Sequence, residues 1–514
     1  MSNNSVDRNA SRTSTRVGVA LLFVGALFRI LSYYFSTNTG GDARERVFLS
    51  ADWLRHPTLK FIFGVYPPGH FWLIGASTLV VHDVVVAGRL LSLGLGIASL
   101  LIFWRLARIL YGDTAGLLSL AVSCLYSMHI AYSATSSSEV SYLFFLLLAM
   151  FFFFSYLQSG SRKLRYLGVS GVFLSIAESI RFEPWAIFLT LLILLPIMLG
   201  WGSPQMTWRR WNRFQPLLVF GITGGIWPVF TMAYCWRAFG DPMYLVTLNH
   251  ARVTQTLAIV PSPLSYQLAL TPVVLIISLS PLAFAAAIYG LAKSFSQRLP
   301  AAFAGLTLFF AAVQCYEIFS SGLLALARYT LTLGTMLAII SGYGLQQICE
   351  RFAPRKPKLA YAIAVGFLFL NPGAVLALSE LPNRYADKFA SVSPRLKYPT
   401  RIAGVGEYLR EHMGRDDAVV IDDYNVESNI VAEAAGLPIF PGRRAYLAST
   451  ANKIGVREYI SAERPRFLVY SDQGTLRHWL VLPSDCNGES KIDAVQFHCR
   501  FTNQIYRVYE LSYH

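Results

Sequence analysis

Long apolar runs alternate with short polar connections over most of the chain, and this pattern predicts a bundle of membrane helices. About eleven runs approach the roughly 20 residues that a helix needs to cross the hydrocarbon core of a bilayer. The predicted spans lie near 17–36, 86–109, 114–133, 138–157, 165–181, 184–200, 215–236, 266–292, 300–319, 325–346 and 359–378. No comparable run follows Leu378.

The remaining residues, 379–514, carry more charge and change their periodicity. The stretch IAGVGEYLREHM is amphipathic at helical spacing, DAVVID and RFLVYS have the pattern of short buried strands, and IYRVYEL that of a terminal strand. We therefore expect a small α/β domain here. The predicted organisation is a tail (1–16), a membrane domain (17–378) whose first outer loop is 37–85, and a C-terminal domain (379–514).

Composition supports the membrane assignment. The 514 residues are 54% hydrophobic and only 14% charged, whereas about a quarter of a soluble chain is charged. The net charge of +15 comes from short basic clusters between apolar runs, without a continuous stripe interleaved with aromatics. Nucleic-acid binding is therefore not expected.

The basic clusters predict the orientation. Arg8, Arg12 and Arg16 precede the first span, and no small-residue cleavage site follows it, so the N-terminus is expected to be a cytoplasmic anchor. With the N-terminus in the cytoplasm, the even-numbered connections between spans lie on the cytoplasmic side. These connections hold the Lys and Arg clusters, as the positive-inside rule requires. The C-terminal domain is then extracytoplasmic. A bacterial inner membrane and its periplasm fit this topology, and an endoplasmic reticulum membrane would give the same pattern.

The first outer loop holds the main catalytic candidates. Asp42 follows Gly40 and Gly41, whose flexible backbone would let a carboxylate approach a substrate, and Glu45 lies three residues further on. A partly desolvated carboxylate can act as a general base. The alternative is that both are solvated loop acids.

The segment from Phe61 to Val81 is apolar but is interrupted by Pro67, Pro68 and Gly69. It predicts two short helices in the membrane plane, with Tyr66 and His70 at the interface. His70 has no neighbours at ligand spacing, so no metal site is expected there.

Other ionisable residues lie at the outer ends of spans. Placing a charge there costs free energy, so these residues suggest a functional site or a pathway. Glu139 opens the fourth span, and Glu178, Arg181 and Glu183 lie around the next outer turn. Glu178 and Arg181 could simply neutralise each other at i, i+3 spacing. Three arginines are candidates for a lipid-linked phosphate, because a guanidinium offers a planar fork of donors: Arg328 beside Tyr329, Arg181 and Arg252.

The order of these elements resembles the GT-C glycosyltransferases, in particular glycosyltransferase family 39, over residues 17–350. The matching features are an Asp after the first span, the elements YPPGHFWL, SSSEVSYLFFLLL and IRFEPW, and the late span ARYTLTLGTMLAIISGYGL. Two features depart from the family: Asp42 is followed by Ala43 instead of an acid, and Tyr66 stands where the aminoarabinose branch tends to have Lys.

The resemblance implies an inverting transferase that moves a sugar from a polyprenyl-phosphate donor to a lipid, protein or glycan acceptor. Its other partners would be the surrounding membrane lipids. Asp42 would be the catalytic base and Arg328 a donor-phosphate residue. Glu139 and Arg181 would line the cavity, where we also place Tyr66, His70, Glu183 and Tyr329.

No cofactor is required by this chemistry, and a divalent cation is left open. Asp422, Asp423 and Glu427 invite a metal hypothesis, but acids between a strand and a helix are more often caps. Cys486 and Cys499 stand in the predicted extracytoplasmic domain and are disulfide candidates, with two buried thiols as the alternative.

Two other functions compete with the transferase. A transporter or lipid-linked glycan flippase also has many spans, but it usually shows internal repeats or broken helices, neither of which is clear in the sequence. A non-catalytic scaffold with a sensory outer domain is the second.

Overall fold

The computed structural model describes residues 3–40, 42–58, 66–159, 163–200, 214–259, 263–320, 323, 326–381, 389–422, 427–438, 444–447, 455–483, 486, 489–492, 494–503 and 505–513. The chain forms two compact units, Met1–Leu396 and Lys397–His514. The predicted boundary lies at 378/379, close to the end of the last long helix.

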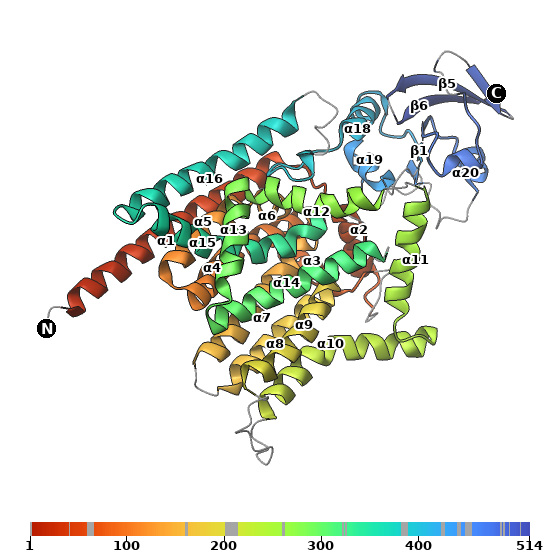
Figure 1. The fold of residues 1–514 in the computed structure, drawn as a ribbon. Helices are drawn as coiled ribbons and strands as arrows, with labels where there is room; N and C mark the ends of the chain where they lie inside the picture. The colour runs from red at the N-terminus through yellow and green to blue at the C-terminus, as the bar shows by residue number, and fades with distance from the viewer. Residues whose placement is uncertain are drawn as a thin grey trace. The chain divides into compact units, whose positions relative to one another are not determined.

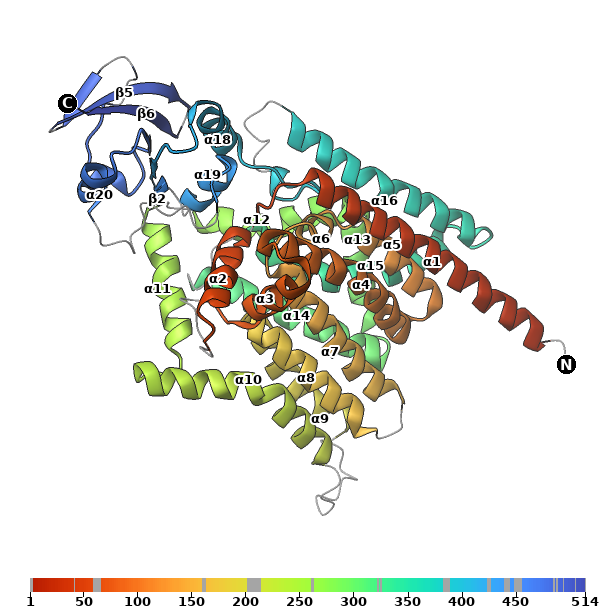
Figure 2. The same ribbon diagram turned by 180° about the vertical axis from the view of Figure 1, so that it is seen from behind.

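The first unit is helical (Figures 1 and 2). Its elements are α1 (Asn3–Phe35), α2 (Ala43–Arg55), α3 (Gly69–Val81), α4 (Val84–Tyr111), α5 (Asp113–Leu125), α6 (Ser127–Tyr132), α7 (Glu139–Ser159), α8 (Leu164–Ile180), α9 (Glu183–Met198), α10 (Gln215–Phe239), α11 (Tyr244–Ile259), α12 (Leu264–Leu279), α13 (Pro281–Ser294), α14 (Arg298–Phe319), the 3₁₀ helix η2 (Ala327–Thr330), α15 (Leu331–Phe352) and α16 (Pro357–Glu380).

Every predicted span coincides with a helix or a helix pair. Among the described residues, six helices are long and apolar enough to cross a bilayer, or seven if the bent pair α12–α13 counts as one span. That pair bends by 111° at Ser280, whose φ of 89° interrupts the helix. The predicted 114–133 span is likewise divided, since Tyr126 is extended between α5 and α6. The helices α8 and α9 have 17 and 16 residues.

The first outer loop contains α2 and α3. Of the two short helices predicted within 61–81, the described residues of that segment hold one, α3, while α2 lies earlier in the loop and residues 61–65 lie outside the described residues. A Cβ on Gly69 would lie 2.2 Å from Ser179 Oγ, so the start of α3 lies directly against the end of α8. This contact places the loop over the helix ends that carry Arg181.

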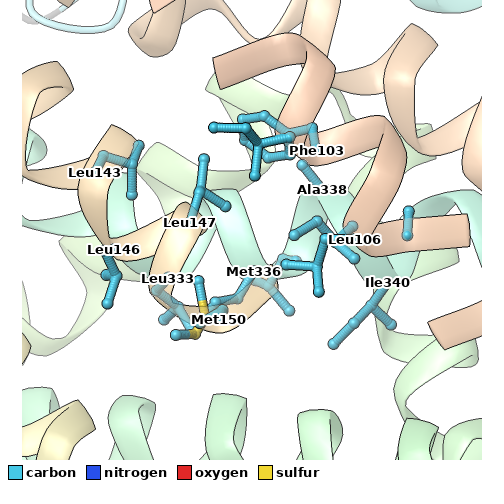
Figure 3. Close-up of a cluster of buried hydrophobic side chains, with 14 of the residues drawn as sticks. Phe103, Leu106, Leu143, Leu146, Leu147, Met150, Leu333, Met336, Ala338 and Ile340 are labelled. Atoms are coloured by element: carbon cyan, nitrogen blue, oxygen red, sulfur yellow. The ribbon is translucent and has the colours of Figure 1, made fainter. Parts of the chain in front are cut away.

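The core of the bundle lies between α4, α7 and α15. Figure 3 shows Phe103 and Leu106 of α4, Leu147 of α7 and Met336 of α15 in one cluster, and all four are fully buried.

Glycines allow the closest helix approaches. At Gly344 of α15 a Cβ would lie 1.8 Å from the carbonyl oxygen of Ala286 in α13. Small residues are typical of membrane helix interfaces because van der Waals packing drives association where lipid removes the hydrophobic driving force.

The second unit is a six-stranded mixed sheet with the order β2-β1-β3-β6-β5-β4. Strands β2, β1 and β3 are parallel, and the other pairings are antiparallel. The elements are α18 (Thr400–His412), β1 (Val419–Ile421), α19 (Ser428–Ala434), β2 (Ala445–Leu447), α20 (Val456–Glu463), β3 (Phe467–Tyr470), the 3₁₀ helix η4 (Leu476–His478), β4 (Glu489–Ile492), β5 (Val495–Thr502) and β6 (Arg507–Tyr513).

The strands alternate between two cores. Val419 and Ile421 of β1 pack with Val405 of α18, whereas Val420 packs with Ile460 of α20. The period of two is the reason that DAVVID and RFLVYS form buried strands. The expected α/β domain is therefore present.

The acids proposed as metal candidates have structural partners. The carboxylate of Asp422 is fully buried and accepts hydrogen bonds from the backbone N–H groups of Ser471 (3.0 Å) and Leu476 (2.8 Å). Glu427 pairs with Arg401 and accepts a hydrogen bond from Tyr506. Asp423 lies outside the described residues. The part of the chain that the structure describes holds no cluster of three or more metal-ligating side chains.

Candidate active site

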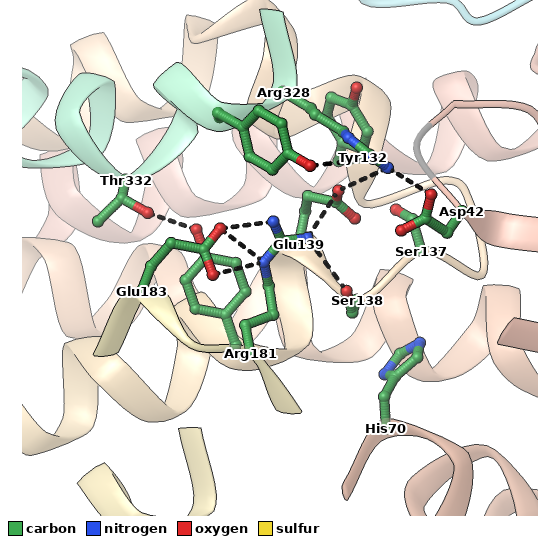
Figure 4. Close-up of polar contacts among 12 residues, drawn as sticks. Asp42, His70, Tyr132, Ser137, Ser138, Glu139, Arg181, Glu183, Arg328 and Thr332 are labelled. Carbon is green, nitrogen blue, oxygen red and sulfur yellow. Dashed lines mark hydrogen bonds and ion pairs between the residues drawn. The ribbon is translucent and has the colours of Figure 1, made fainter. Parts of the chain in front are cut away.

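Several elements that are distant in sequence bring acids and arginines together in the first unit. Figure 4 shows Asp42, Glu139, Arg181, Glu183 and Arg328 joined by hydrogen bonds and ion pairs. They come from the start of α2, the start of α7, the α8–α9 junction and η2. Sequence reasoning predicted all five as site residues, and the structure brings them into one network.

Asp42 stands at the N-cap position of α2 but makes no capping hydrogen bond with its side chain. Its Oδ1 instead lies 2.8 Å from Arg328 Nη1, and 22% of its side chain remains exposed. The preceding Gly40 has φ of +98°, a conformation that favours glycine, so the backbone can turn into α2 at this point. A carboxylate that caps no helix is available for chemistry.

The charge of Asp42 is set by its neighbours. Burial alone would raise the pKa of Asp42, but the guanidinium groups of Arg328 and Arg46 outweigh it and hold the pKa below its usual value. The carboxylate is therefore ionised at neutral pH.

Glu139 opens α7 and is 1% exposed. Its Oε1 accepts a hydrogen bond of 3.1 Å from Arg181 Nη1 and lies 3.8 Å from Arg328 Nη1. Its Oε2 has no hydrogen-bond partner in the described parts of the chain. Glu139 thus links the two arginines.

Arg181 has an extended backbone (φ −148°, ψ 166°) between α8 and α9, so its side chain leaves the helix direction. Its Nε lies 2.9 and 3.0 Å from the two carboxylate oxygens of Glu183, and Nη1 also reaches Ser138 at 3.3 Å. The rings of Tyr142 and Tyr329 lie 5.2 and 5.5 Å from its Cζ. With its donors occupied by protein groups, Arg181 is arranged to hold Glu139 and Glu183 in place.

Arg328 lies in η2, where its Cζ is 5.0 Å from the ring of Tyr329. Apart from its ion pairs to Asp42 and Glu139, its Nη2 donates to the hydroxyl of Tyr329 at 3.3 Å. Its Nε makes no hydrogen bond within the described residues. Arg328 therefore retains donor capacity that Arg181 does not.

Backbone contacts hold the loops around this network. Asn38 Oδ1 accepts the backbone N–H of Ser136 at 2.8 Å, and Arg89 donates to the carbonyls of Ala134 and Ser36 at 2.8 and 2.9 Å. His70 is fully buried, with Nε2 2.9 Å from the carbonyl of Ser136. Since a carbonyl only accepts, Nε2 carries the proton, and His70 has a positioning role in the loop before Glu139.

The remaining candidates differ in their placement. Tyr66 is half-buried and lies under the guanidinium of Arg46. Glu45 is half-buried in the first turn of α2. Arg252 is exposed on α11, and none of the network's hydrogen bonds or ion pairs described above involves it. Glu178 does not neutralise Arg181: its two carboxylate oxygens are buried without a hydrogen-bond partner in the described structure.

One residue of the site was missed. Arg46 of α2 is 2% exposed, and its Cζ lies 4.2 Å from the Tyr66 ring centroid and 5.2 Å from that of Phe71. The available signal was its i+4 spacing from Asp42, which places both residues on one side of the first turn. With Arg46 included, three carboxylates face three guanidinium groups.

The bundle and its acid–arginine centre define a polytopic membrane protein, and comparisons with known proteins place its fold. Residues 65–226 match the family model described as dolichyl-phosphate-mannose-protein mannosyltransferase. A search of curated proteins finds no significant match.

Solved structures are similar over nearly the whole chain. ArnT from Cupriavidus metallidurans in the apo state has a TM-score of 0.59 at 12% identity, covering 97% of this chain and 98% of that chain. The same enzyme bound to undecaprenyl phosphate gives 0.58 at 13% identity, covering 98% of both chains. AglB from Archaeoglobus fulgidus, in complex with an inhibitory peptide and a dolichol-phosphate, gives 0.50 at 13%, covering 90% and 70%. The chain has the GT-C glycosyltransferase fold, which confirms the expectation from the sequence.

Proposed function

We propose that the protein is a membrane glycosyltransferase that moves a sugar from a polyprenyl-phosphate donor to an acceptor hydroxyl, with Asp42 as general base. The observation that carries the proposal is the Asp42–Arg328 pair, a partly exposed ionised carboxylate 2.8 Å from an arginine that has a free donor. The family match and the likeness to an enzyme crystallised with undecaprenyl phosphate support the donor class.

The proposed step balances with the groups present. The acceptor oxygen forms a bond to the anomeric carbon while its proton passes to Asp42 Oδ. The bond between the anomeric carbon and the phosphate oxygen breaks, and its electron pair stays on the phosphate. Because the phosphate is already a good leaving group, a base and cations for the departing charge are sufficient. Direct attack opposite the leaving group inverts the configuration, as no covalent intermediate forms.

We place this site at the extracytoplasmic face of a bacterial inner membrane, with the N-terminus in the cytoplasm. The support is the distribution of Lys and Arg over the alternate connections, which are cytoplasmic in this orientation. The acceptor is then a hydroxyl of a lipid, protein or glycan that is exposed on that side.

The test is Asp42→Asn, with Asp52→Asn as matched control because Asp52 is an exposed residue of the same helix. Glycan profiles of membranes from a deletion strain and from complemented strains are compared by mass spectrometry. Loss of a general base typically costs about 10²–10⁴-fold in rate, so Asp42→Asn should fail to restore the product while Asp52→Asn restores it. Full restoration by Asp42→Asn, at wild-type protein level, contradicts the proposal.

A flippase or transporter is the second candidate, and the 111° break between α12 and α13 favours it, because broken helices are common in transporters. Sealed vesicles distinguish the two. Movement of a polyprenyl-phosphate sugar across the bilayer without formation of a glycan would identify the transporter.

A further inference from the structure

Arg29 is a buried cation in the first membrane helix, and the transfer step described above does not use it. It lies in α1, whose residues Ser14–Phe35 form a candidate span, and its side chain is fully buried. Its hydrogen-bond partners among the described residues are all uncharged groups. An arginine at this depth is costly, so its presence indicates a function.

Three hydrogen bonds occupy the guanidinium of Arg29. Nη1 donates to the carbonyl of Gly25 in α1 at 2.9 Å, and Nη2 donates to the carbonyl of Ser123 in α5 at 3.1 Å. Nη2 also lies 2.8 Å from Nδ1 of His129 in α6. Because a guanidinium only donates, Nδ1 is the acceptor, and His129 is the neutral tautomer with its proton on Nε2. Arg29 thus links three helices.

The break between α5 and α6 explains why a donor is needed there. Helix α5 ends at Leu125, and the extended backbone of Tyr126 (φ −68°, ψ 102°) interrupts the helical hydrogen bonds. The last carbonyls of a helix have no partner within it, and inside a bilayer no water replaces that partner. Arg29 fills the carbonyl of Ser123, and the helix dipole also favours a cation at a helix C-terminus. Arg29 therefore stabilises the break from outside the broken span.

Close packing brings Arg29 to the break and fixes the imidazole. A Cβ on Gly25 would lie 2.6 Å from the sulfur of Cys124, so α1 lies directly against α5 at this level. The ring of Phe103 in α4 meets the ring of His129 edge to face, with centroids 5.7 Å apart. His129 is therefore held between the guanidinium and an aromatic ring, in one orientation.

The short helix α6 contacts two of the segments that carry candidate-site residues. Thr330 Oγ1, in the 3₁₀ helix η2 that carries Arg328, donates to the sulfur of Met128 at 3.7 Å. A Cβ on Gly40, in the loop that leads into α2, would lie 3.5 Å from the ring of Tyr132. The position of α6 therefore sets how η2 and the start of α2 approach one another.

A third segment follows α6 directly in the chain. The backbone N–H and Oγ of Ser133 both donate to the carbonyl of His129, at 3.2 and 2.6 Å. The buried loop that begins here ends at Ser138, whose Oγ accepts a hydrogen bond from Arg181 Nη1 at 3.3 Å. Glu139 is the next residue. The backbone of His129 is thus connected through hydrogen bonds and a buried loop to the start of α7.

We propose that Arg29 and His129 are positioning residues, whose hydrogen bond holds the α5–α6 break so that α6 sets the places of Asp42, Glu139 and Arg328. The inference rests on the proposed function, because it concerns the rate of that transfer step. No hydrogen bond or ion pair within the described structure joins the side chain of either residue to the three groups that they position. A change at either residue therefore acts through α6.

The experiment compares the rate of product formation with the stability of the folded protein. Inducible wild type and variants complement the deletion strain, and mass spectrometry follows the glycan that the wild type adds, per amount of full-length protein that gel filtration shows to be folded. The variants are Arg29→Met, His129→Leu, His129→Asn and the double variant Arg29→Met/His129→Leu. Phe23→Ala is the matched control, because Phe23 is an exposed residue of α1. Melting temperatures are measured in detergent.

Arg29→Met separates positioning from stability. Replacing a buried ionic group by an apolar side chain of similar volume is often neutral or stabilising, so the melting temperature should change little, although the Ser123 carbonyl loses a partner. A displacement of about 1 Å at catalytic groups can cost on the order of 100-fold, so the rate per folded molecule should fall roughly 10- to 100-fold. A purely structural arginine would leave that rate unchanged. Phe23→Ala should alter neither property.

The His129 variants test the acceptor. In His129→Asn the side-chain oxygen can accept in place of Nδ1, so this variant should keep most of the rate. His129→Leu removes the acceptor and should lose roughly 10-fold or more. Because Arg29→Met and His129→Leu break the same contact, the double variant should lose no more than Arg29→Met alone.

Each outcome decides for or against the pair. A wild-type rate in folded Arg29→Met, or equal rates in His129→Asn and His129→Leu, refutes the positioning role and leaves the proposed function standing. Losses that multiply in the double variant show that the residues act separately, which also refutes the pair. If Arg29→Met does not fold, the two His129 variants decide, and if these do not fold either, the contact is structural alone and the inference fails. If the wild type adds no glycan, the proposed function fails and the inference with it.

Discussion

At the scale of residues, the sequence predicted the acids and arginines that meet but not all of their partners. Glu178 and Arg181 have i, i+3 spacing, yet α8 ends at Ile180 and the extended backbone at Arg181 turns that side chain toward Glu139 and Glu183. Arg46 stands among alternating charges that resemble a solvated face, and its burial depends on Tyr66, 20 positions later in the numbering. Tertiary contacts of this kind leave no local pattern.

The ion pair with Arg328 predicts a pH effect. In the wild type the pKa of Asp42 is depressed, so the base is ionised above that pKa and is lost only as the pH falls through it. Arg328→Gln removes a cause of the depression, so the pKa of Asp42 should rise. The acidic limb of the pH–rate profile should then move to higher pH, whatever the change in maximal rate. Arg55→Gln is the control.

The substitution Arg328→Gln should also change the pH dependence of stability, through the same depressed pKa of Asp42. The Asp42–Arg328 pair stabilises the fold above the pKa of Asp42 in the unfolded chain, and this stabilisation disappears as the pH falls through the depressed value. Arg328→Gln should therefore destabilise the protein at neutral pH and less in acid. An acidic limb that stays in place in the folded variant would contradict the assignment of that limb to Asp42.

At the scale of elements, apolar runs predicted where helices lie but not where they break. An all-apolar run such as 266–292 carries no boundary signal, and the bend at Ser280 depends on backbone geometry that packing imposes. The break at Tyr126 likewise depends on backbone geometry and has no boundary signal in the apolar run. The presence of the helices was therefore predictable from the apolar runs, whereas the breaks within them were not.

The α13–α15 contact gives a prediction for one helix interface. Gly344→Ala would place a Cβ 1.8 Å from the carbonyl oxygen of Ala286, so the helices must separate. Overpacking of this kind typically costs about 1–3 kcal/mol. We expect a lower melting temperature in detergent and, because α15 follows η2, reduced transferase activity.

Gly366→Ala in α16 is the matched control, because nothing lies within 4 Å of its Cβ position. It should leave both properties unchanged or improve stability slightly. Equal melting temperatures for the two variants would show that the contact is not tight in solution.

At the scale of the whole molecule, the change in periodicity after Leu378 predicted the second unit and its strands. The compact units nevertheless divide at 396/397 because the connecting segment returns to the first outer loop. The carbonyl of Leu396 accepts the backbone N–H of Thr37 at 2.9 Å, and that of Pro394 accepts Ser32 Oγ at 2.6 Å. Such long-range hydrogen bonds have no signature in composition.

The second unit contains a disulfide between Cys486 and Cys499, whose Cα atoms are 5.2 Å apart. Closing a loop of this length restricts the unfolded chain and is worth about 3 kcal/mol in the chain-entropy model. The double variant Cys486→Ser/Cys499→Ser should therefore lower the unfolding temperature of this unit. Limited proteolysis on heating measures that temperature. Cys315→Ser, at an exposed free cysteine, serves as control. Unchanged proteolysis in the double variant would contradict the stabilising role.

The equal numbers of acids and arginines in the site have a consequence for selectivity. A site with surplus positive charge would bind any dissolved anion, whereas here an incoming anion that pairs with Arg328 must compete with the carboxylate of Asp42, which is already in place. A dissolved ion present at low concentration competes poorly against such a tethered group, whose effective concentration is in the millimolar range or above. A headgroup anchored in the same bilayer is itself confined near the site, and confinement, more than charge, would then decide which phosphates are admitted.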